Sequence, residues 1–236
     1  MKKILISGGD GDFAKLILKY NTKFKIFAPS KRKMDVTKLK SIIDFIKKTK
    51  VNCFIHAAAL TKPMSQHNTE IQKSIKTNII GTSNAVIACS LLKIKIIYIS
   101  TNFIYPGIKG NYKETDYLMP VNSYGWSKLG GECAVKLYKN SLILRVCMTE
   151  DVYPHNIAYT NYVTSFLKKS DAAKIILKLI DKKGIINIGG EKNSAYNFAK
   201  KYNKEIKKGK IPKNKRHLIG NNTSLNIKKL NSLYHF

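Results

Sequence analysis

The chain has 236 residues, 44% of them hydrophobic, which suits one large globular domain or a domain with a small appendage. Its net charge of +29 raises the question of nucleic-acid binding, but only three of its 43 basic residues are arginine. Proteins that read nucleic acid favour arginine for bidentate contacts. We therefore attribute the lysine excess to compositional drift and expect no specific nucleic-acid partner.

The amino terminus predicts a strand, a turn and a helix. An apolar run at residues 3–6 meets a glycine-rich turn, and an apolar-periodic segment follows at 13–20. Gly8, Gly11 and Ala14 occupy the small positions of a Gly-x-x-Gly-x-x-Ala turn, which lets a pyrophosphate approach the backbone at a helix start. The cofactor-binding residues predicted here are Gly8, Gly11, Asp12 and Phe13.

The end of the second strand, expected at residues 24–28, indicates which cofactor is bound. An NAD-selective site usually carries an acidic residue there, which holds the adenosine ribose. This chain has Ser30, Lys31 and Arg32 instead, and a hydroxyl with two cations suits a 2′-phosphate. We therefore predict NADPH in preference to NADH.

A helix follows at residues 38–49, with Asp35 or Thr37 as its expected cap. The third strand, 51–59, ends in three alanines, Ala57, Ala58 and Ala59, which leave room for a flat cofactor. A long helix is expected over 68–92 and contains Asn78.

The next strand, 94–99, is a continuous apolar run, as expected for a central parallel strand. It is followed by Ser100 and Thr101. Because ligands in open α/β sheets bind at the carboxyl ends of strands, these hydroxyls should face the crevice of the glycine turn.

Tyr124 and Lys128 stand four residues apart in a segment that reads as the start of a helix after Pro120. Residues at this spacing share one helical face. A nearby ammonium favours the phenolate, so Lys128 should lower the pKa of Tyr124 toward the range of a general acid or base. A surface Tyr and Lys on an amphipathic helix is the simpler interpretation of this pair alone.

In the remaining sequence we expect strands at 142–146 and 184–190 and helices at 171–180, 194–202 and 227–233. Residues 147–170 show no hydrophobic periodicity from which an element could be predicted. The alternation predicts an α/β fold, a Rossmann-type doubly wound parallel sheet with helices on both faces and a small C-terminal substrate-binding region. We expect an NADP-binding domain at 1–146 and a small substrate-binding region at 147–236, interleaved with the returning strand 184–190.

The four cysteines, Cys53, Cys89, Cys133 and Cys147, are far apart and have no histidine at ligand spacing. They are predicted to be small buried residues in a reducing compartment, with no metal site. No signal peptide is visible, and no apolar stretch approaches the roughly 20 residues that span a bilayer. We expect a soluble cytoplasmic protein with no membrane partner.

The motifs resemble those of the extended short-chain dehydrogenase/reductases, and within them the dTDP-4-dehydrorhamnose reductase-like proteins. The resemblance covers most of residues 1–200. The matching motifs are the glycine turn, Asp35-Val36-Thr37, Ala57-Ala58-Ala59, Asn78-x-x-Gly81-Thr82, Ser100-Thr101, Glu114-Thr115-Asp116, Tyr124 with Lys128 and Gly130-Gly131-Glu132, and the segments 184–190 and 194–199. Two features depart from the family: Asn102 stands where Asp is common, and the region 147–170 is shorter.

The resemblance implies NADPH-dependent reduction of a 4-keto-6-deoxy sugar nucleotide, as in dTDP-rhamnose biosynthesis. Tyr124 would donate the proton, Lys128 would also bind the nicotinamide ribose, and Thr101 would hold the carbonyl oxygen. The implied cofactor-binding residues are Gly8, Gly11, Asp12, Phe13, Ser30, Lys31, Arg32, Asp35, Val36, Ala57, Ala58, Ala59, Asn78, Ser100, Tyr124 and Lys128. The implied substrate-binding residues are Thr61, Asn102, Phe103, Tyr105, Asn161 and Tyr162. The expected partner is a nucleotide sugar, and a homodimer is the oligomer considered.

Other functions are open at this point. The related 4,6-dehydratases carry an Asp-Glu pair after the catalytic Thr, where this chain has Asn102 and Phe103. Epimerase-reductases of the GDP-fucose type use a Cys in the same loop, and none lies between Cys89 and Cys133. The alternative from another class is a catalytically decayed NADP- or nucleotide-sugar-binding module, or a regulatory subunit.

Overall fold

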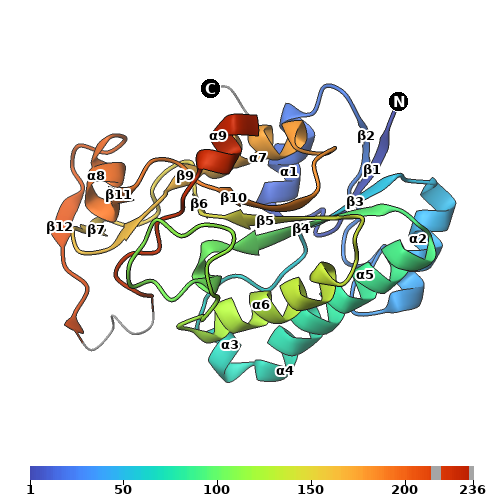
Figure 1. Cartoon of the computed structure of the whole chain (residues 1–236), viewed down its shortest axis with the longest axis horizontal. Helices are drawn as coiled ribbons and strands as arrows, with labels where there is room; N and C mark the ends of the chain where they lie inside the picture. Colours follow the sequence, from blue (N-terminus) through green and yellow to red (C-terminus); the bar gives the residue numbers. More distant parts are fainter. Residues whose placement is uncertain (214–218, 234–236) are drawn as a thin grey trace. The chain divides into compact units, whose positions relative to one another are not determined.

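The structure is a computed structural model and describes residues 1–213 and 219–233 (Figure 1). The chain folds into two compact units, each assembled from three segments. The first unit contains Met1–Ser100, Ser127–Leu144 and Ala173–Ile185. The second unit contains Thr101–Trp126, Arg145–Ala172 and Ile186–Phe236.

A six-stranded sheet has the strand order β10-β5-β4-β3-β1-β2. Its strands are β1 (Lys3–Ile6), β2 (Lys25–Phe27), β3 (Cys53–His56), β4 (Lys95–Thr101), β5 (Ser141–Val146) and β10 (Gly184–Ile188). The ladders of β1 with β2, β1 with β3, and β3 with β4 are parallel. The order reverses between β1 and β3, which is the switch point where ligands bind in doubly wound sheets. The predicted fold class is confirmed.

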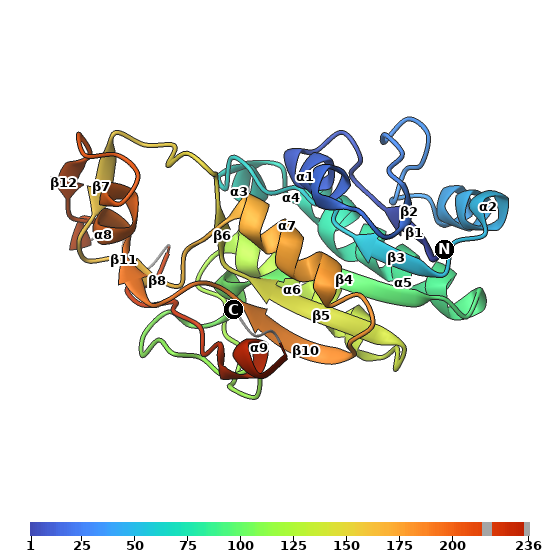
Figure 2. The ribbon, with the colours of Figure 1, turned by 90° about the horizontal axis from the view of Figure 1, so that it is seen from above.

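Helices cover both faces of this sheet (Figures 1 and 2). Helix α1 (Asp12–Tyr20) lies on one face, and α5 (Gly81–Leu91) and α6 (Ser123–Lys136) lie on the other. Helix α2 (Leu39–Thr49) packs against α5. Helix α7 (Lys169–Lys178) lies near α1, since the amine of its Lys174 is 4.8 Å from the ring centre of Tyr20.

The core of the first unit forms where these helices meet the sheet. Leu5, Phe54 and Ile96 from three neighbouring strands are fully buried. Ile42 and Ile46 of α2 join them, because residues four apart share one helical face. This apolar layer fixes the strand ends on which the candidate site is built.

The helix expected over 68–92 is wrong in detail, because the structure divides it into four pieces. They are α3 (Gln66–Thr69), α4 (Ile71–Ser74), the π-helical turn η1 (Ile75–Ile80) and α5. Glu70 has φ −118° and ψ 54°, which is not helical, and separates the first two. The residues before the break are polar, and none of them is glycine or proline, so no helix-ending signal in the sequence reveals it.

The expected cap of α2 is also wrong. This helix follows Lys38 and has no side-chain cap. Asp35 is engaged elsewhere: its Oδ1 accepts hydrogen bonds from the backbone N–H and the hydroxyl of Thr37, at 3.0 and 2.8 Å. The carboxylate therefore shapes the loop before the helix instead of the helix end.

The second unit contains the region 147–170, for which the sequence showed no periodicity. Its short strands are β6 (Met148–Thr149), β7 (Ile157–Tyr159), β8 (Val163–Thr164), β9 (Leu167–Lys168), β11 (Asn193–Ser194) and β12 (Lys207–Gly209). They pair β6 with β9, β7 with β12 and β8 with β11. Helices α8 (Ala195–Lys200) and α9 (Lys228–Leu233) confirm the last two predicted helices.

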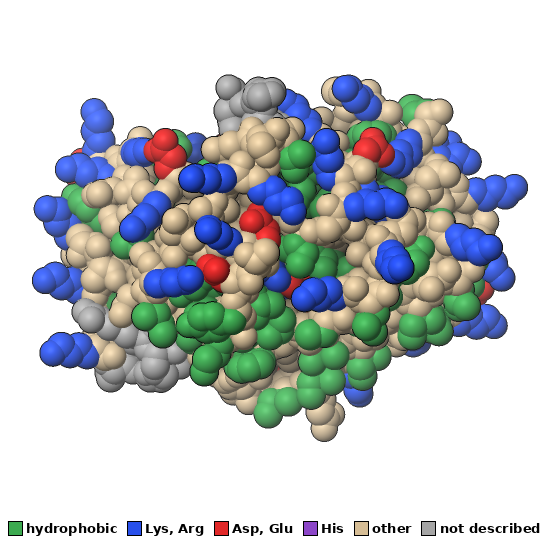
Figure 3. Space-filling view, viewed as in Figure 1, with side chains coloured by type: hydrophobic (Ala, Val, Ile, Leu, Met, Phe, Trp, Pro, Cys, Tyr) green, Lys and Arg blue, Asp and Glu red, His purple; other side chains and the backbone are tan. Residues whose placement is uncertain are grey.

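Three of the four cysteines are buried as predicted, but Cys133 is exposed on α6. In the described parts of the chain, no helix combines the length and the apolar character needed to cross a bilayer. Lysine and arginine side chains are spread over the face seen in Figure 3, with apolar side chains gathered below them. The basic residues of this face do not form a single patch.

Candidate active site

The glycine turn after β1 is built by close backbone approaches. Gly8 has φ +75°, a conformation that favours glycine, and Gly11 donates its N–H to the Gly8 carbonyl at 2.9 Å. A Cβ on Gly9 would lie 2.2 Å from the Ala28 oxygen, whereas one on Gly11 would meet only Gly8. The turn is thus packed closely against Ala28 at Gly9 and is open at Gly11. The open side can accept a pyrophosphate at the start of α1.

The sequence prediction did not include Gly9 among the residues of this turn. The consecutive glycines Gly8 and Gly9 were the signal that could have identified it. Of the other predicted residues of this turn, Asp12 is exposed in the first turn of α1 and Phe13 is half-buried beside it. An acidic residue at a helix start is favourable to the helix dipole, so Asp12 has a local role without any ligand.

The loop after β2 carries the residues predicted to select the cofactor. Lys31 and Arg32 are exposed, and Ser30 accepts a backbone hydrogen bond from Met34 that closes the turn. Burial opposes ionisation of Asp35, but the hydrogen bonds of Thr37 together with nearby lysines hold the pKa of Asp35 below its usual value. The loop therefore presents cations around a fixed carboxylate.

A polar chain supports the three alanines after β3. The hydroxyl of Ser7 accepts the N–H groups of Ala57 and Ala58 at 3.2 and 3.1 Å and lies 2.9 Å from His56 Nδ1. His56 Nε2 lies 3.0 Å from the hydroxyl of Thr82. Burial, with a smaller effect of Lys128, lowers the pKa of His56 to about 3, so the ring is neutral. This neutral ring holds the alanine segment in place.

Asn78 has a structural role in the described structure. Its amide binds the backbone N–H and carbonyl of Leu60 at 2.8 and 3.0 Å and donates to the Ser127 hydroxyl at 2.8 Å. The side chain thereby joins the segment after β3 to helix α6. Its predicted contact with cofactor remains a prediction, and its side-chain groups are already engaged by protein.

Lys128 is buried among polar and aromatic partners of the first unit. Its amine lies 4.2 Å from the centre of the Tyr98 ring, and the Tyr98 hydroxyl donates to the Lys128 carbonyl at 3.0 Å. Burial lowers the pKa of Lys128 to about 7, while the Glu132 carboxylate acts in the opposite direction. Glu132 in turn accepts a hydrogen bond from Ser100 at 2.7 Å.

Glu132 is a site residue that the sequence prediction left out. It stands four residues after Lys128, the same spacing that singled out Tyr124, so it shares that helical face. Its side chain is 1% exposed and orders both Ser100 and the charge of Lys128. The i, i+4 spacing was the signal that could have identified it.

In the second unit, Tyr124 is hydrogen-bonded to Thr101. Thr101 also accepts the Phe103 N–H at 3.3 Å, and the rings of Phe103 and Tyr124 meet edge to face with centres 6.0 Å apart. A Cβ on Gly125 would lie 2.4 Å from the Phe103 oxygen, so glycine lets α6 begin against this loop. The phenol is thus positioned by one hydroxyl and one ring.

The predicted direction of the Tyr124 pKa shift is wrong. Burial raises the pKa of Tyr124 to about 12, and the hydrogen bond to Thr101 only partly offsets this. The sequence spacing indicated the attraction of a lysine but not the desolvation of both groups. The phenol is therefore fully protonated at neutral pH.

Asn102 lies in a closed cluster of hydroxyl groups. It is 3% exposed, and its amide nitrogen donates to the hydroxyls of Thr164 and Thr223 at 3.2 and 3.0 Å. These two hydroxyls are 2.9 Å apart, and the Cys147 sulfur lies 3.1 Å from Thr164. The residue that departs from the family pattern is therefore bound by partners that match an amide.

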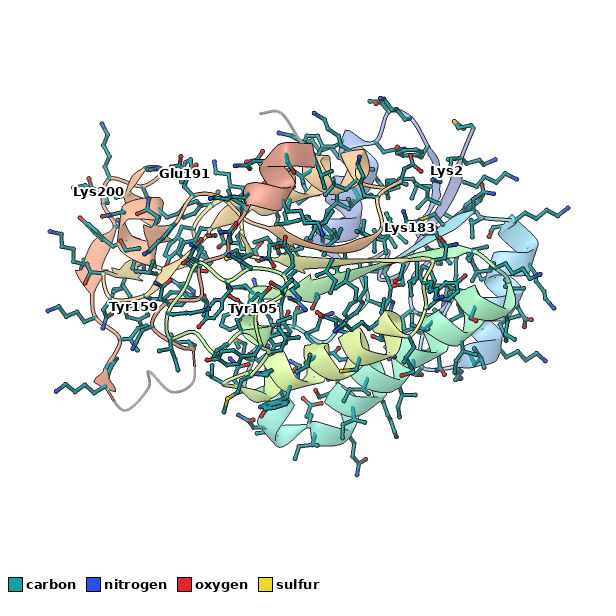
Figure 4. The ribbon with its side chains drawn as sticks, viewed as in Figure 1. Lys2, Tyr105, Tyr159, Lys183, Glu191 and Lys200 are labelled. Carbon is teal, nitrogen blue, oxygen red and sulfur yellow. The ribbon has the colours of Figure 1, made fainter. Side chains whose placement is uncertain are left out.

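Tyr105, predicted to bind substrate, is buried in a network of polar and aromatic side chains. It has no exposed surface, accepts a hydrogen bond from Arg145 at 2.7 Å, and lies 3.0 Å from Asn187 (Figure 4). Its ring stacks on Tyr112 with centres 4.7 Å apart. Burial raises its pKa to about 12, with Arg145 acting in the other direction. Its predicted contact with substrate remains a prediction, and its hydroxyl is already engaged by protein groups.

The other predicted substrate residues are dispersed. Thr61 is exposed in the first unit. In the second unit, Asn161 exchanges two hydrogen bonds with the backbone of Ile211, at 2.8 and 3.2 Å. Tyr162 is half-buried, and burial together with nearby Cys147 raises its pKa far above the usual value.

Comparison with known proteins gives the family context. A family model described as the RmlD substrate binding domain matches residues 1–184. The dTDP-4-dehydrorhamnose reductase of Aggregatibacter actinomycetemcomitans is 30% identical over 165 residues, which are 68% of this chain and 56% of that protein. The GDP-6-deoxy-D-talose 4-dehydrogenase of the same organism is 32% identical over 146 residues, 58% of this chain and 48% of that protein. The chain thus matches about half the length of these curated relatives.

A crystal structure of dTDP-4-dehydrorhamnose reductase from Bacillus anthracis in complex with NADP has the same fold. Its TM-score is 0.89 at 22% identity, and the alignment covers 98% of this chain and 92% of that chain.

Proposed function

Because the chain belongs to the RmlD substrate binding domain family, we propose that it reduces the 4-keto group of a nucleotide-linked 6-deoxy sugar with NADPH. The two curated relatives named above act, by their names, on dTDP-4-dehydrorhamnose and on GDP-6-deoxy-talose. The class that the two names share is a 6-deoxy sugar nucleotide handled at carbon 4. The base of the nucleotide differs between the two relatives and is left open for this chain.

The observation that carries the proposal is the protonated Tyr124 bound to Thr101, on the helix that also carries Lys128 one turn later. Reduction of a ketone requires a proton at the carbonyl oxygen, and a general acid must hold its proton until the transfer. With its pKa raised to about 12, Tyr124 is in the donating form at every physiological pH.

Each polar residue has a role in this reaction. NADPH would supply the hydride, and the chain must orient the ketone and deliver the proton. Thr101 would hold the carbonyl oxygen beside the Tyr124 hydroxyl. Lys128 would bind the nicotinamide ribose and, when protonated, stabilise the phenolate that remains after transfer.

The residues at the glycine turn support a dinucleotide as cofactor. The open face of Gly11 stands directly before the N-terminus of α1, where a pyrophosphate is favoured. The alanine segment held by Ser7 and His56 would line the cofactor with small side chains. Lys31 and the loop around it favour NADPH through the charge of the 2′-phosphate.

Asn102 argues for simple reduction. A dehydratase needs a further acid and base beside the reacting sugar, and the residue after Thr101 is an amide whose nitrogen donates to two threonines. This amide cannot exchange a proton in the physiological range. The departure from the family pattern therefore does not require a decayed site, since a well-packed cluster accommodates it.

The test is the variant Tyr124→Phe, which removes the proton donor and keeps the ring that packs on Phe103. Turnover of a dTDP- or GDP-linked 4-keto-6-deoxy sugar should fall by about 10²- to 10⁴-fold, while NADPH binding measured by calorimetry should be unchanged. Thr101→Val should lower turnover as well, with the fold retained. Wild-type turnover in Tyr124→Phe would refute the mechanism. A wild type that binds NADPH but reduces no sugar in the panel would favour the binding module.

A further inference from the structure

A pocket of about 630 Å³ opens in the first unit, beside the loop that follows β2. Its lining residues come from two segments: Lys31, Thr37, Thr69, Glu70, Ile71, Gln72, Lys73, Lys76 and Thr77. The volume lies within the range of small-molecule sites. The second segment is the broken helical stretch α3, α4 and η1, which the sequence had suggested to be one regular helix.

Val36, which precedes Thr37 in the loop, packs against α5, the helix that follows the second lining segment. The amide of Asn84 on α5 donates to the Val36 carbonyl at 3.1 Å. A Cβ on Gly81 would lie 3.0 Å from Val36 Cγ2, so the start of α5 lies directly against this loop. On the loop side, Thr37 is fixed by its two hydrogen bonds to Asp35. The loop is therefore held by its own hydrogen bonds and by its packing on α5.

The lining is cationic on both walls. Lys31 stands on the loop, and Lys73 and Lys76 stand on the opposite segment. Lys73 forms an exposed ion pair with Glu70 at 2.9 Å, which leaves Lys31 and Lys76 as the net positive charge of the lining. Ile71 provides an apolar surface, and Gln72 with the threonines provides hydrogen-bonding groups. This composition suits a planar base that carries a phosphate.

We propose that this pocket receives the phosphorylated adenosine end of NADPH, and that Lys76 together with Lys31 selects its 2′-phosphate against NADH. The inference rests on the proposed function, which requires a nicotinamide dinucleotide. The inference changes the set of residues that select NADPH against NADH. Of Ser30, Lys31 and Arg32, only Lys31 lines this pocket, and its partner comes from a segment more than forty residues later in the chain.

The electrostatic reason for selectivity is direct. The 2′-phosphate carries close to two negative charges, which NADH lacks, and two lysines on opposite walls would share them. Because these amines are exposed, each should contribute modestly, about two- to fivefold in affinity, and the effect should weaken with salt. The adenine and pyrophosphate contacts are common to both cofactors and should not change.

The experiment measures the dissociation constants of NADPH and NADH by calorimetry for the full chain and for Lys76→Gln, Lys31→Gln and their double variant. The matched control is Lys40→Gln, which changes an exposed lysine of α2 outside the pocket lining. Arg32→Gln tests the contribution of the loop residue next to Lys31. The expected result is an NADPH affinity that falls about two- to fivefold in each single variant and further in the double variant. NADH affinity and the thermal midpoint should stay at the wild-type values.

Three results would overturn the inference and leave the proposed function standing. One is equal weakening of NADPH and NADH in Lys76→Gln, and the other is an unchanged NADPH affinity in the double variant. Loss of selectivity in Arg32→Gln alone would likewise place the 2′-phosphate outside this pocket. A wild type that binds neither cofactor would refute the proposed function itself, and this inference with it.

Discussion

Tyr124, which is half-buried, and Lys128, which is buried, show how far the spacing of two residues on one helix determines their chemistry. The i, i+4 relation of Tyr124 and Lys128 was readable from the sequence, and so was the presence of Thr101 at a strand end. The pKa directions were not, because the sequence gives no measure of desolvation. Burial moves the pKa of Tyr124 up to about 12 and that of Lys128 down to about 7. Both shifts favour the neutral form of each side chain.

The lowered pKa of Lys128 should be visible in stability. Its folded value of about 7 lies below its usual 10.5, so the unfolded chain binds more protons between these values. The contribution of this group to the free energy of unfolding therefore rises as pH increases from about 7 toward 10.5. Lys128→Met lacks this slope, and its stability relative to wild type should be highest near pH 7 and decline toward pH 10.

Urea unfolding at pH 7, 8.5 and 10 measures this difference. The control is Lys136→Met, which changes an exposed lysine of the same helix and should show a constant offset from wild type. A difference between Lys128→Met and wild type that does not vary by more than about 1 kcal/mol over this range would contradict the lowered pKa, since one unit corresponds to about 1.4 kcal/mol.

Asn102 gives a second test at the residue scale. Its amide donates to the hydroxyls of Thr164 and Thr223, and Asn102→Asp would replace that donor by a buried carboxylate. We expect a loss of about 1–3 kcal/mol in unfolding free energy at pH 7.5. Because burial would raise the folded pKa of the new carboxyl above its unfolded value, the loss should diminish as pH falls toward 5.

The control for this experiment is Asn102→Ala, which removes the donor without adding a charge. Its stability deficit should be independent of pH over the same range. If Asn102→Asp is as stable as wild type at pH 7.5, the threonine hydroxyls have rotated to donate to the carboxylate. The cluster would then not require an amide at position 102.

At the scale of elements, two glycines of the same turn have different roles: Gly9 is required for packing, and Gly11 is expected to leave room for the cofactor. A Cβ on Gly9 would overlap the Ala28 carbonyl, whereas one on Gly11 would meet only the Gly8 oxygen, at 3.1 Å. Gly9→Ala should therefore cost about 1–3 kcal/mol of stability through overpacking. Gly11→Ala should keep the stability of wild type and weaken NADPH, because its methyl group would stand where the pyrophosphate approaches.

Thermal unfolding and cofactor titration of the two variants distinguish these effects. An unstable Gly11→Ala would show that this glycine serves the fold. Undiminished NADPH binding by Gly11→Ala would place the pyrophosphate elsewhere.

The central strands and their helices were predictable because their periods are local. The residues of α2 show this, since Ile42 and Ile46 follow the helical repeat and are buried together. The short strands of the second unit were not predictable. Strand β8 pairs with β11, and β7 pairs with β12, so each partner lies far along the chain and no local pattern marks either strand. The break at Glu70 was hidden for a different reason, because no glycine or proline marks it between Gln66 and Ser74.

At the scale of the whole molecule, the net charge of +29 makes the clearest prediction from composition. A strongly cationic surface attracts duplex DNA without reading its sequence, because the phosphates release counterions when lysines replace them. The basic side chains are spread over the face seen in Figure 3, and arginine, which suits bidentate base contacts, is scarce in the sequence.

We therefore expect weak binding to duplexes of any sequence, with an affinity that falls steeply as salt increases. Fluorescence anisotropy with two unrelated duplexes at 50, 100 and 200 mM salt measures it. The two affinities should agree at every salt concentration, and saturating NADPH should leave them nearly unchanged, since the cofactor neutralises few of the many lysines. A preference for one duplex that persists at 150 mM salt would mean that a specific basic surface exists, and the lysine excess would then be a selected feature of the protein.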